Sequence, residues 1–304
     1  MAEAAAADRR AGFVALIGAP NVGKSTLLNA LVGAKISIVT PKVQTTRTRV
    51  RGIAIEGGAQ LVFVDTPGIF APRRRLDRAM VDSAWASTQD ADLVALLIDA
   101  KKGIKGDDEA ILGGIANVRP EKALVFNKVD LVDKPALLAL TRELNERQAF
   151  AATFMISARN GDGVADLKSW FASHLPAGPW LYPEDQISDA PLRRLAAEIT
   201  REKLYLRLHQ ELPYQSTVET EVWKELKDGS VRIEQTIYVE RDSQRKIVLG
   251  KGGQAIKAIG AAARADIAKA IEQPVHLFLH VKVRQGWGDD PERYREMGLE
   301  FPKE

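Results

Sequence analysis

The stretch GAPNVGKS at residues 18–25 decides the fold of the first half of the chain. It fits the pattern G-x-x-x-x-G-K-[ST], whose glycines let backbone N–H groups surround phosphates at the positive end of a helix. An apolar strand is predicted at 13–17, directly before it, and an amphipathic helix from Ser25. Lys24 is expected to reach the β- and γ-phosphates of a nucleotide, and the Ser25 hydroxyl to bind Mg²⁺. The loop residues predicted to bind the nucleotide are Gly18, Asn21, Val22, Gly23, Lys24, Ser25 and Thr26.

Short apolar runs alternate with amphipathic segments of helical length from residue 13 to about residue 175. This alternation indicates a mostly parallel sheet covered on both faces, a doubly wound α/β P-loop NTPase domain. The pair 47–55 and 60–64 differs, because EGGA at 56–59 predicts a hairpin and therefore one antiparallel edge strand. The other predicted strands are 13–17, 93–99, 123–127 and 154–157.

The phosphate loop alone does not distinguish ATP from GTP, but later segments do. DTPG at 65–68 follows an apolar strand, about 40 residues after the loop. Its carboxylate, Asp65, is expected to hold a metal-bound water, and the Gly68 N–H to sense the γ-phosphate.

NKVD at 127–130 is the segment that selects the base. The Asp130 carboxylate can accept hydrogen bonds from guanine N1–H and the 2-amino group. Adenine offers neither, and an unpaired desolvated carboxylate costs at least ~1–3 kcal/mol. SAR at 157–159 completes the pocket if the Ala158 N–H meets guanine O6. The predicted base-site residues are Asn127, Lys128, Asp130, Ser157, Ala158 and Arg159.

A switch segment is predicted at 41–47, PKVQTTR, between the phosphate loop and Asp65. A threonine there can bind Mg²⁺ only when the γ-phosphate is present, so the segment can change its order with the nucleotide. We expect Thr46 to be that threonine, because Arg47 begins the next strand, and Thr45 to be an ordinary loop residue. The predicted metal ligands are Ser25, Thr46 and Asp65.

These five signatures, in this order, resemble the translation-factor-like class of P-loop GTPases. The resemblance places catalysis on Lys24, Thr46 and Gly68. The chain departs from many small GTPases at Ile69, where a glutamine would orient the attacking water. In related GTPases without that glutamine, an asparagine at the position of Asn21 helps to bind a monovalent cation, so the resemblance implies K⁺-stimulated hydrolysis. The arginines at 73–75 are interpreted as a solvated loop rather than a catalytic or RNA contact.

A second domain follows the proline- and glycine-rich stretch HLPAGPWLYPEDQ at 174–186. From residue 191 the predicted order is α-β-β-α-α-β. The segment IVLGKGGQAIKAIG at 247–260 carries the GXXG loop of a KH domain, which clamps about four nucleotides of single-stranded RNA. Ile247, Ile256 and Ile259 are expected to pack beneath it. The order matches the bacterial type of the α+β KH fold.

The charge distribution supports an RNA site at this loop. Residues 241–270 carry seven basic and two acidic side chains, a net +5, whereas the whole chain has only +3. Positive charge is thus concentrated where RNA is expected. The predicted RNA contacts are Arg245, Lys246, Gly250, Lys251, Gly252, Gly253 and Lys257. His276 and His280, without an acidic or cysteine partner nearby, are expected to pack or to stack on RNA rather than bind a metal.

Composition bounds the remaining classes. The chain has 304 residues and no cysteine, which excludes disulfides, zinc fingers and cysteine nucleophiles and suggests a reducing cytoplasm. Its longest apolar run, LVALLI at 93–98, is too short to span a bilayer. We expect a monomer. The predicted divisions are a flexible tail at 1–11, a GTP-binding domain at 12–176, a linker at 177–190 and the KH domain with its C-terminal tail at 191–304.

The joining segments PLRRLAAEITREK (191–203), ELPY (211–214) and KVRQGW (282–287) resemble the Era family of bacterial GTPases. This resemblance covers residues 12–299 and implies binding to the 3′ end of 16S rRNA and a role in assembly of the small (30S) ribosomal subunit. It also implies peripheral contact with the inner membrane. Two alternatives stay open: an RNA-binding assembly scaffold with a structural nucleotide site, and a membrane-associated regulatory GTPase.

Overall fold

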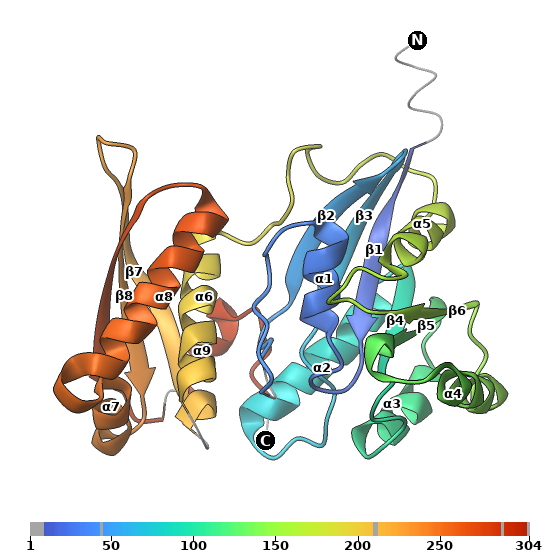
Figure 1. Ribbon diagram of the computed structural model, residues 1–304, viewed down its shortest axis with the longest axis horizontal. Coiled ribbons are helices and arrows are strands. Elements are labelled where there is room, and N and C mark those ends of the chain that lie inside the picture. The colour runs from blue at the N-terminus through green and yellow to red at the C-terminus, as the bar shows by residue number, and fades with distance from the viewer. Residues whose placement is uncertain (1–8, 43–44, 209–211, 287–288, 303–304) are drawn as a thin grey trace, which may run out of the picture. The chain divides into compact units, whose positions relative to one another are not determined.

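The computed structural model describes residues 9–42, 45–208, 212–286 and 289–302 and divides into two compact units (Figure 1). The first contains the described residues up to Ser37, those from 45 to Asp189, and those from Met297. The second contains Ile38–Lys42 and Ala190–Glu296. Residues 43–44, 211 and 287 of the segments quoted above lie outside this description.

The first unit is a six-stranded sheet in the order β2-β3-β1-β4-β5-β6. Every neighbouring pair is parallel except β2 and β3, which form the predicted antiparallel hairpin. The strands are β1 (Arg10–Ile17), β2 (Val50–Glu56), β3 (Ala59–Asp65), β4 (Leu93–Asp99), β5 (Glu121–Asn127) and β6 (Ala152–Ile156). All residues of β3 and β4 are buried, as expected for strands covered on both faces. The predicted fold class is confirmed.

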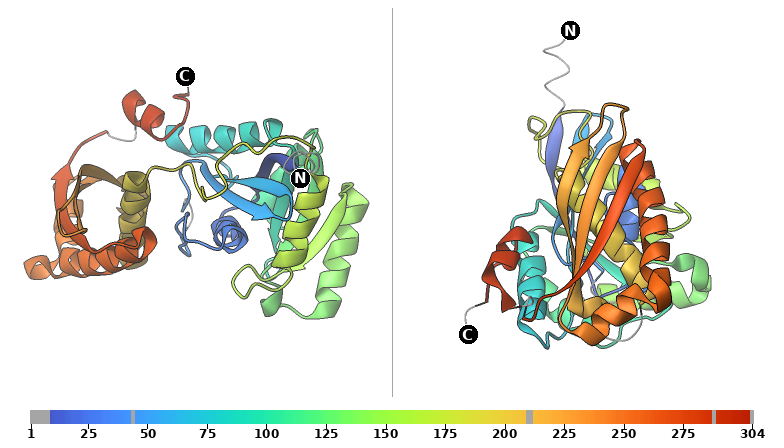
Figure 2. Two further views of the ribbon diagram at one scale, coloured as in Figure 1. Left: turned by 90° about the horizontal axis from the view of Figure 1, so that it is seen from above. Right: turned by 90° about the vertical axis from the view of Figure 1, so that its left-hand side faces the viewer.

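Helices cover both faces of this sheet (Figure 2). Helices α1 and α5 pack together on one face and α2 on the other. On the α5 face, Phe171 meets Phe63 of β3 edge to face, with ring centroids 5.8 Å apart. The helices are α1 (Lys24–Val32), α2 (Arg75–Gln89), α3 (Asp107–Ile115), α4 (Lys134–Arg147) and α5 (Val164–His174).

Two strands of this sheet begin three residues away from their predicted starts. Strand β1 begins at Arg10, inside the expected tail, because the Arg10 N–H donates to the Gly58 carbonyl and its guanidinium to the Leu175 carbonyl. Strand β2 begins at Val50 rather than at residue 47, because Val50 pairs with Asp65, the last residue of β3, and β3 offers no partner beyond it. Apolar patterning does not reveal such polar anchors.

The predicted linker is a strap along β2 and β3 as far as Asp189. Gln60 of β3 is fully buried, and its side-chain oxygen accepts the N–H groups of Leu181 and Tyr182 at 2.7 and 2.9 Å. The Ile53 N–H of β2 donates to the Ile187 carbonyl at 2.9 Å. The strap therefore covers part of the edge that β2 would otherwise expose.

The second unit has the predicted order α-β-β-α-α-β, with a three-stranded sheet in the order β7-β8-β9. Strand β8 pairs antiparallel with β7 and parallel with β9, and helices α6 and α8 pack against one another beside this sheet (Figure 2). Its elements are α6 (Leu192–Arg207), β7 (Ser216–Glu225), β8 (Val231–Val239), α7 (Asp242–Leu249), α8 (Gln254–Ile271), β9 (Val275–Val283) and α9 (Pro291–Glu296).

The predicted packing of Ile247 is wrong. Its side chain is 57% exposed, while Val248, the next residue of α7, is fully buried. Ile259 is buried and Ile256 packs against the same cluster, as expected. In a helix, adjacent residues point about 100° apart, so only one of the two can face the core.

Across the described residues, helices long and apolar enough to cross a membrane do not occur.

Candidate functional site

The phosphate loop joins β1 to α1 at the carboxyl edge of the sheet, and its glycines fit tightly. A Cβ on Gly23 would come within 2.2 Å of the Asn127 amide nitrogen, and one on Gly18 within 2.5 Å of the Leu97 carbonyl. Both have positive φ, 101° and 149°. Asn21 is left-handed as well, at φ 65°, which asparagine tolerates better than most residues. The glycines therefore admit neighbouring strand ends close to the loop.

Lys24 begins α1 and is buried. Its ammonium donates to the Gly18 and Ala19 carbonyls, both at 3.1 Å. Burial lowers the pKa of Lys24 to about 8, and the negative charges of Asp65 and Asp108 partly oppose this effect. A phosphate group beside this ammonium would favour its charged form and raise the pKa again.

A cluster of hydroxyls surrounds Asp65, the last residue of β3. Its Oδ2 accepts from the hydroxyls of Ser25 (2.7 Å), Ser37 (2.9 Å) and Thr46 (3.1 Å). The Ser25 and Thr46 oxygens are 2.8 Å apart. The structure thus brings together the three predicted metal ligands, although they come from three separate segments.

The other oxygen of Asp65, Oδ1, is buried and has no hydrogen-bond partner among the described residues. Burial raises the pKa of Asp65, while Lys24 and the three hydroxyls lower it. A carboxylate with a spare oxygen beside two hydroxyl oxygens is the hard donor set that Mg²⁺ prefers. The residues therefore fit a magnesium ion.

Ser37 was not predicted. It is buried beside Asp65, and the only signal in the sequence is a small polar residue inside the apolar run ISIV at 36–39. Of the two candidate threonines, it is Thr46 whose hydroxyl donates to Asp65.

The loop after β3 packs on the phosphate loop. A Cβ on Gly68 would lie 2.9 Å from backbone atoms of Pro20. The Ile69 N–H donates to the Gly18 carbonyl at 3.1 Å, and the Ile69 side chain is buried in the core. Ile69 therefore cannot orient a water molecule. Of the arginines at 73–75, the first two are exposed, and their N–H groups bond to Asp77 at the start of α2.

Asn127, at the end of β5, ties the base loops to the phosphate loop. Its amide donates to the Val22 carbonyl at 2.8 Å, and its oxygen accepts the N–H groups of Lys128 (2.8 Å) and Ala158 (3.0 Å). Because the Ala158 N–H already has this partner, its expected bond to guanine O6 stays a prediction. Asp130 is exposed, as a carboxylate that reads a ligand must be before the ligand binds.

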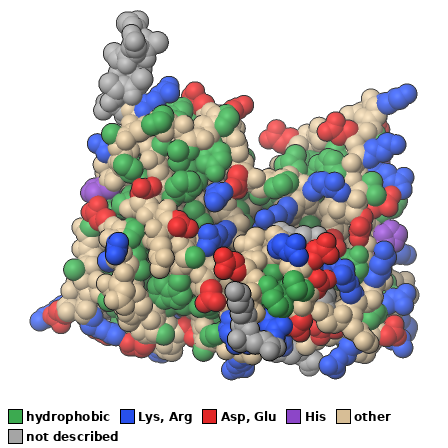
Figure 3. Space-filling model, turned by 180° about the vertical axis from the view of Figure 1, so that it is seen from behind, with side chains coloured by type: hydrophobic (Ala, Val, Ile, Leu, Met, Phe, Trp, Pro, Cys, Tyr) green, Lys and Arg blue, Asp and Glu red, His purple; other side chains and the backbone are tan. Residues whose placement is uncertain are grey.

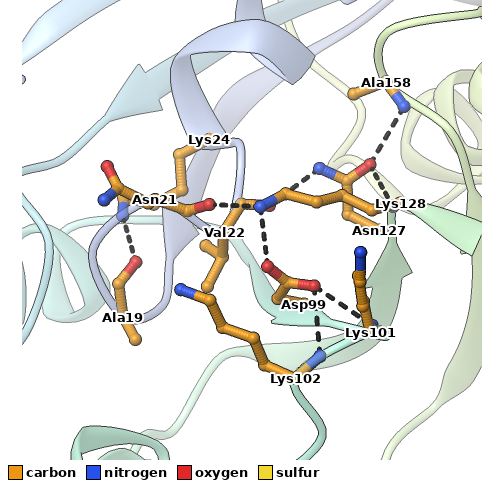
Figure 4. A network of polar contacts seen from close by, with 10 residues as sticks. All are labelled: Ala19, Asn21, Val22, Lys24, Asp99, Lys101, Lys102, Asn127, Lys128 and Ala158. Carbon is orange, nitrogen blue, oxygen red and sulfur yellow. Dashed lines mark hydrogen bonds and ion pairs between the residues drawn. The ribbon is translucent and has the colours of Figure 1, made fainter. Parts of the chain in front are cut away.

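Lys128 reaches from the end of β5 to the phosphate loop, where its ammonium donates to the Asn21 carbonyl at 2.7 Å (Figure 4). The same ammonium lies 2.6 Å from Oδ2 of Asp99, the last residue of β4. Asp99 was not predicted. Its signal is an acidic residue where an apolar strand reaches the carboxyl edge, the edge at which such sheets bind ligands.

The GXXG loop of the second unit lies between α7 and α8. Gly250, Gly252 and Gly253 all have positive φ, at 72°, 59° and 76°. A Cβ on Gly250 would come within 2.6 Å of the Ala255 Cβ, so this turn needs glycine for space as well as conformation. The predicted basic contacts Arg245, Lys246, Lys251 and Lys257 are all exposed around it. Figure 3 shows Lys and Arg side chains gathered along the outer edge of this unit.

Two exposed features of this unit add to the prediction. The exposed Ile247 adds an apolar side chain close to the GXXG loop. His276 and His280 are exposed on β9, so they do not pack in the core as one of the two predictions had it. Between them Phe278 is 46% exposed, and the Arg232 guanidinium lies 4.8 Å from its ring centroid.

Comparisons with known proteins found a matching family for each half of the chain. The family described as "50S ribosome-binding GTPase" matches residues 13–128, and the KH domain family matches 211–288. The chain is 67% identical to "GTPase Era" of Afipia carboxidovorans over 304 residues, covering 100% of this chain and 99% of the relative. It is 68% identical to "GTPase Era" of Bradyrhizobium diazoefficiens over 99% of this chain and 97% of the relative.

Two solved structures resemble the chain over nearly its full length. One is a variant of Aquifex aeolicus Era bound to GDP and AlF4⁻, and the other is Era in complex with MgGDPNP and nucleotides 1506–1542 of 16S ribosomal RNA. Each has a TM-score of 0.90, is 38% identical, and covers 95% of this chain and 99% of its own.

Proposed function

This chain belongs to the Era family of GTPases, and from that premise we propose that its GTP- and GDP-bound states bind single-stranded RNA with different affinity. The RNA we propose is the 3′ end of 16S rRNA, which places the protein in the cytoplasm at assembly of the small ribosomal subunit. The observation that carries the proposal is the pairing of a guanine-nucleotide site with an exposed, basic GXXG loop in one chain. A relative crystallised with 16S rRNA nucleotides supports the choice of RNA.

The reaction is hydrolysis of GTP to GDP and phosphate. Lys24 would bind the β- and γ-phosphates, and Asn127 would hold the base loops against the phosphate loop. Ser25, Thr46 and Asp65 would hold Mg²⁺, which when bound neutralises charge on the phosphate oxygens. Asp130 would select guanine by accepting from N1–H and the 2-amino group.

The switch segment supplies the proposed coupling. Ser37 and Thr46 both bond to Asp65 in the nucleotide unit, yet Ile38–Lys42 between them belong to the second unit. Within that unit, the Val39 N–H donates to the Glu202 carboxylate of α6 at 3.0 Å. Loss of the γ-phosphate would remove the ligand that Thr46 contacts, and the order of the segment beside it would then change.

Gly253→Asp is expected to reduce crosslinking to the 3′ end of 16S rRNA about tenfold or more. The new carboxylate would repel RNA phosphates, since backbone contacts dominate this affinity. The measurement is crosslinking to cellular RNA with GTP or GDP, followed by sequencing. Gly229→Asp is the matched control: it has a similar φ of 80° and open space, but it lies in the β7–β8 turn. Wild-type protein without 16S rRNA enrichment would refute the RNA proposal, and equal enrichment with GTP and GDP would refute the coupling.

Asn21→Asp and Asn21→Ala are expected to remove stimulation of GTP hydrolysis by K⁺, which we propose acts as a cofactor. The buried Ile69 cannot orient the attacking water, so hydrolysis needs another contribution. A K⁺ ion would add positive charge near the transferring phosphate, and one such electrostatic contribution is worth about tenfold or more. Turnover is compared in K⁺ and in Na⁺ at constant ionic strength. Equal turnover of the wild type in both salts would sink the proposal, and so would a K⁺ response that survives in both variants.

The competing functions are separable by simple assays. A scaffold with a structural nucleotide site would bind GTP without steady turnover. A membrane-associated GTPase would float with liposomes of inner-membrane composition, which is also the test of the proposed peripheral membrane contact. Sedimentation velocity would test the expected monomer.

A further inference from the structure

Asp99 occupies a fixed position at the carboxyl edge of the sheet. It ends β4, and only 4% of its surface is exposed. Its Oδ1 accepts the N–H groups of Lys101 (3.1 Å) and Lys102 (3.4 Å), so the turn that follows β4 orients the carboxylate (Figure 4). Its other oxygen, Oδ2, is left to face Lys128 at 2.6 Å.

Lys128 joins three loops through one ammonium group. Its backbone is left-handed at φ 67°, directly after β5. Its Nζ bonds both to Asp99, at the end of β4, and to the Asn21 carbonyl of the phosphate loop at 2.7 Å. The side chain is 30% exposed, so this ion pair is partly shielded from water and the bond is charge-assisted.

We propose that Asp99 is a positioning residue that holds Lys128 across the nucleotide site and thereby slows the release of guanine nucleotides. The inference rests on the proposed nucleotide site. Asp99 holds the Lys128 ammonium beside the Asn21 carbonyl. The aliphatic part of the Lys128 side chain therefore extends from the base loop to the phosphate loop (Figure 4). A nucleotide can leave only when these loops separate, and the Asp99–Lys128–Asn21 bridge opposes that separation.

A purely structural role for Asp99 makes a different prediction. If Asp99 served only to cap the turn at Lys101 and Lys102, an amide oxygen would do the same work, because asparagine also accepts backbone N–H bonds. Asp99→Asn keeps that acceptor and the shape but removes the negative charge that holds the ammonium. Release would then be unchanged under the turn-cap role and faster under the proposed one.

The test is a double-mutant cycle on the full chain, measured as the release rate of fluorescently labelled GDP with Mg²⁺ present. The variants are Asp99→Asn, Lys128→Met and the pair together, with Asp99→Glu as the conservative replacement. Asp92→Asn is the matched control, since Asp92 lies just before the other end of β4 and accepts the Phe13 N–H at 2.7 Å. Thermal melting checks that each variant folds.

We expect Asp99→Asn to release GDP about tenfold faster, the size of one charge-assisted hydrogen bond. Its effect should vanish in the Lys128→Met background, and Asp99→Glu should restore most of the slow release. Release of inosine diphosphate should accelerate by the same factor, because Asp99 does not read the base. Asp92→Asn should release GDP at the wild-type rate.

Three results would overturn the inference: release from Asp99→Asn at the control rate, effects of Asp99→Asn and Lys128→Met that multiply independently, or acceleration confined to one of the two bases. Failure of the proposed nucleotide site is distinguishable from these results, because wild-type protein would then not retain GDP at all.

Discussion

Lys24→Ala is expected to lower steady-state GTP hydrolysis by about 10³-fold or more. The substitution removes the positive charge that would stabilise the developing charge on the transferring phosphoryl group, and such electrostatic terms are usually the largest in this chemistry. Multiple-turnover phosphate release measures it directly. Lys122→Ala is the matched control: Lys122 lies near the start of β5, at the opposite edge of the sheet, and its ammonium donates to the Val118 carbonyl at 2.7 Å.

A second readout separates loss of the lysine charge from misfolding. Because burial lowers the pKa of Lys24 to about 8, the ammonium is increasingly neutral above that pH in the nucleotide-free protein. Nucleotide binding then has to take up a proton, so affinity should fall as pH rises from 7 to 9.5, approaching tenfold per unit above the pKa. Lys24→Ala should flatten this dependence. Turnover near the wild-type level, or an unchanged pH profile in Lys24→Ala, would refute the role assigned to Lys24.

Asp130→Asn is expected to weaken GTP binding about 100-fold and to improve binding of xanthosine triphosphate. The Asp130 carboxylate matches two donors on guanine, and an unmatched polar pair in a base pocket costs several-fold to many-fold in affinity. Xanthine carries an oxygen in place of the 2-amino group, and an asparagine amide can donate to it while accepting from N1–H. Competition binding with both nucleotides measures the change in preference.

Asp133→Asn is the control for this exchange. Asp133 is three residues away, precedes α4, and its side chain makes no capping bond to the helix. It should leave the preference for GTP intact. If Asp130→Asn also keeps that preference, another group must recognise the base. The first group to test would then be the Ala158 N–H, which donates to Asn127 in this structure.

Most residues of the nucleotide site could be predicted from short sequence motifs, because the chemistry of these motifs is local. Gly23 and Lys24 are adjacent in the sequence, and a backbone that surrounds phosphates needs glycine whatever the rest of the fold is. The alternation of apolar runs and helices likewise predicted the parallel sheet, and the turn EGGA at 56–59 predicted its antiparallel edge. The choice of Thr46 over Thr45 came from the position of Arg47 in a strand that in fact begins three residues later, at Val50. The choice agrees with the geometry, but its stated reason does not.

The sequence alone did not predict which side chains and segments pack together. Ile247 and Val248 are both apolar and adjacent, and nothing local says which of them faces the core of the second unit. Ser37 looks like an ordinary interruption of an apolar run until the fold brings it to Asp65, 28 residues later. The sequence likewise gave no sign of what the predicted linker packs on. In the structure its Leu181 N–H donates to the side chain of the fully buried Gln60.

The sequence by itself determined the class of protein: a guanine-nucleotide site built on a parallel sheet, followed by a GXXG loop in a basic segment. These features depend on residues a few positions apart, whose backbone conformation and charge need no distant partner. The tertiary structure decided which polar groups serve the site from elsewhere. Asp99 and Lys128 are 29 residues apart and meet only because β4 and β5 are neighbours whose ends reach the same edge. Such a contact depends on strand order, which no local pattern encodes.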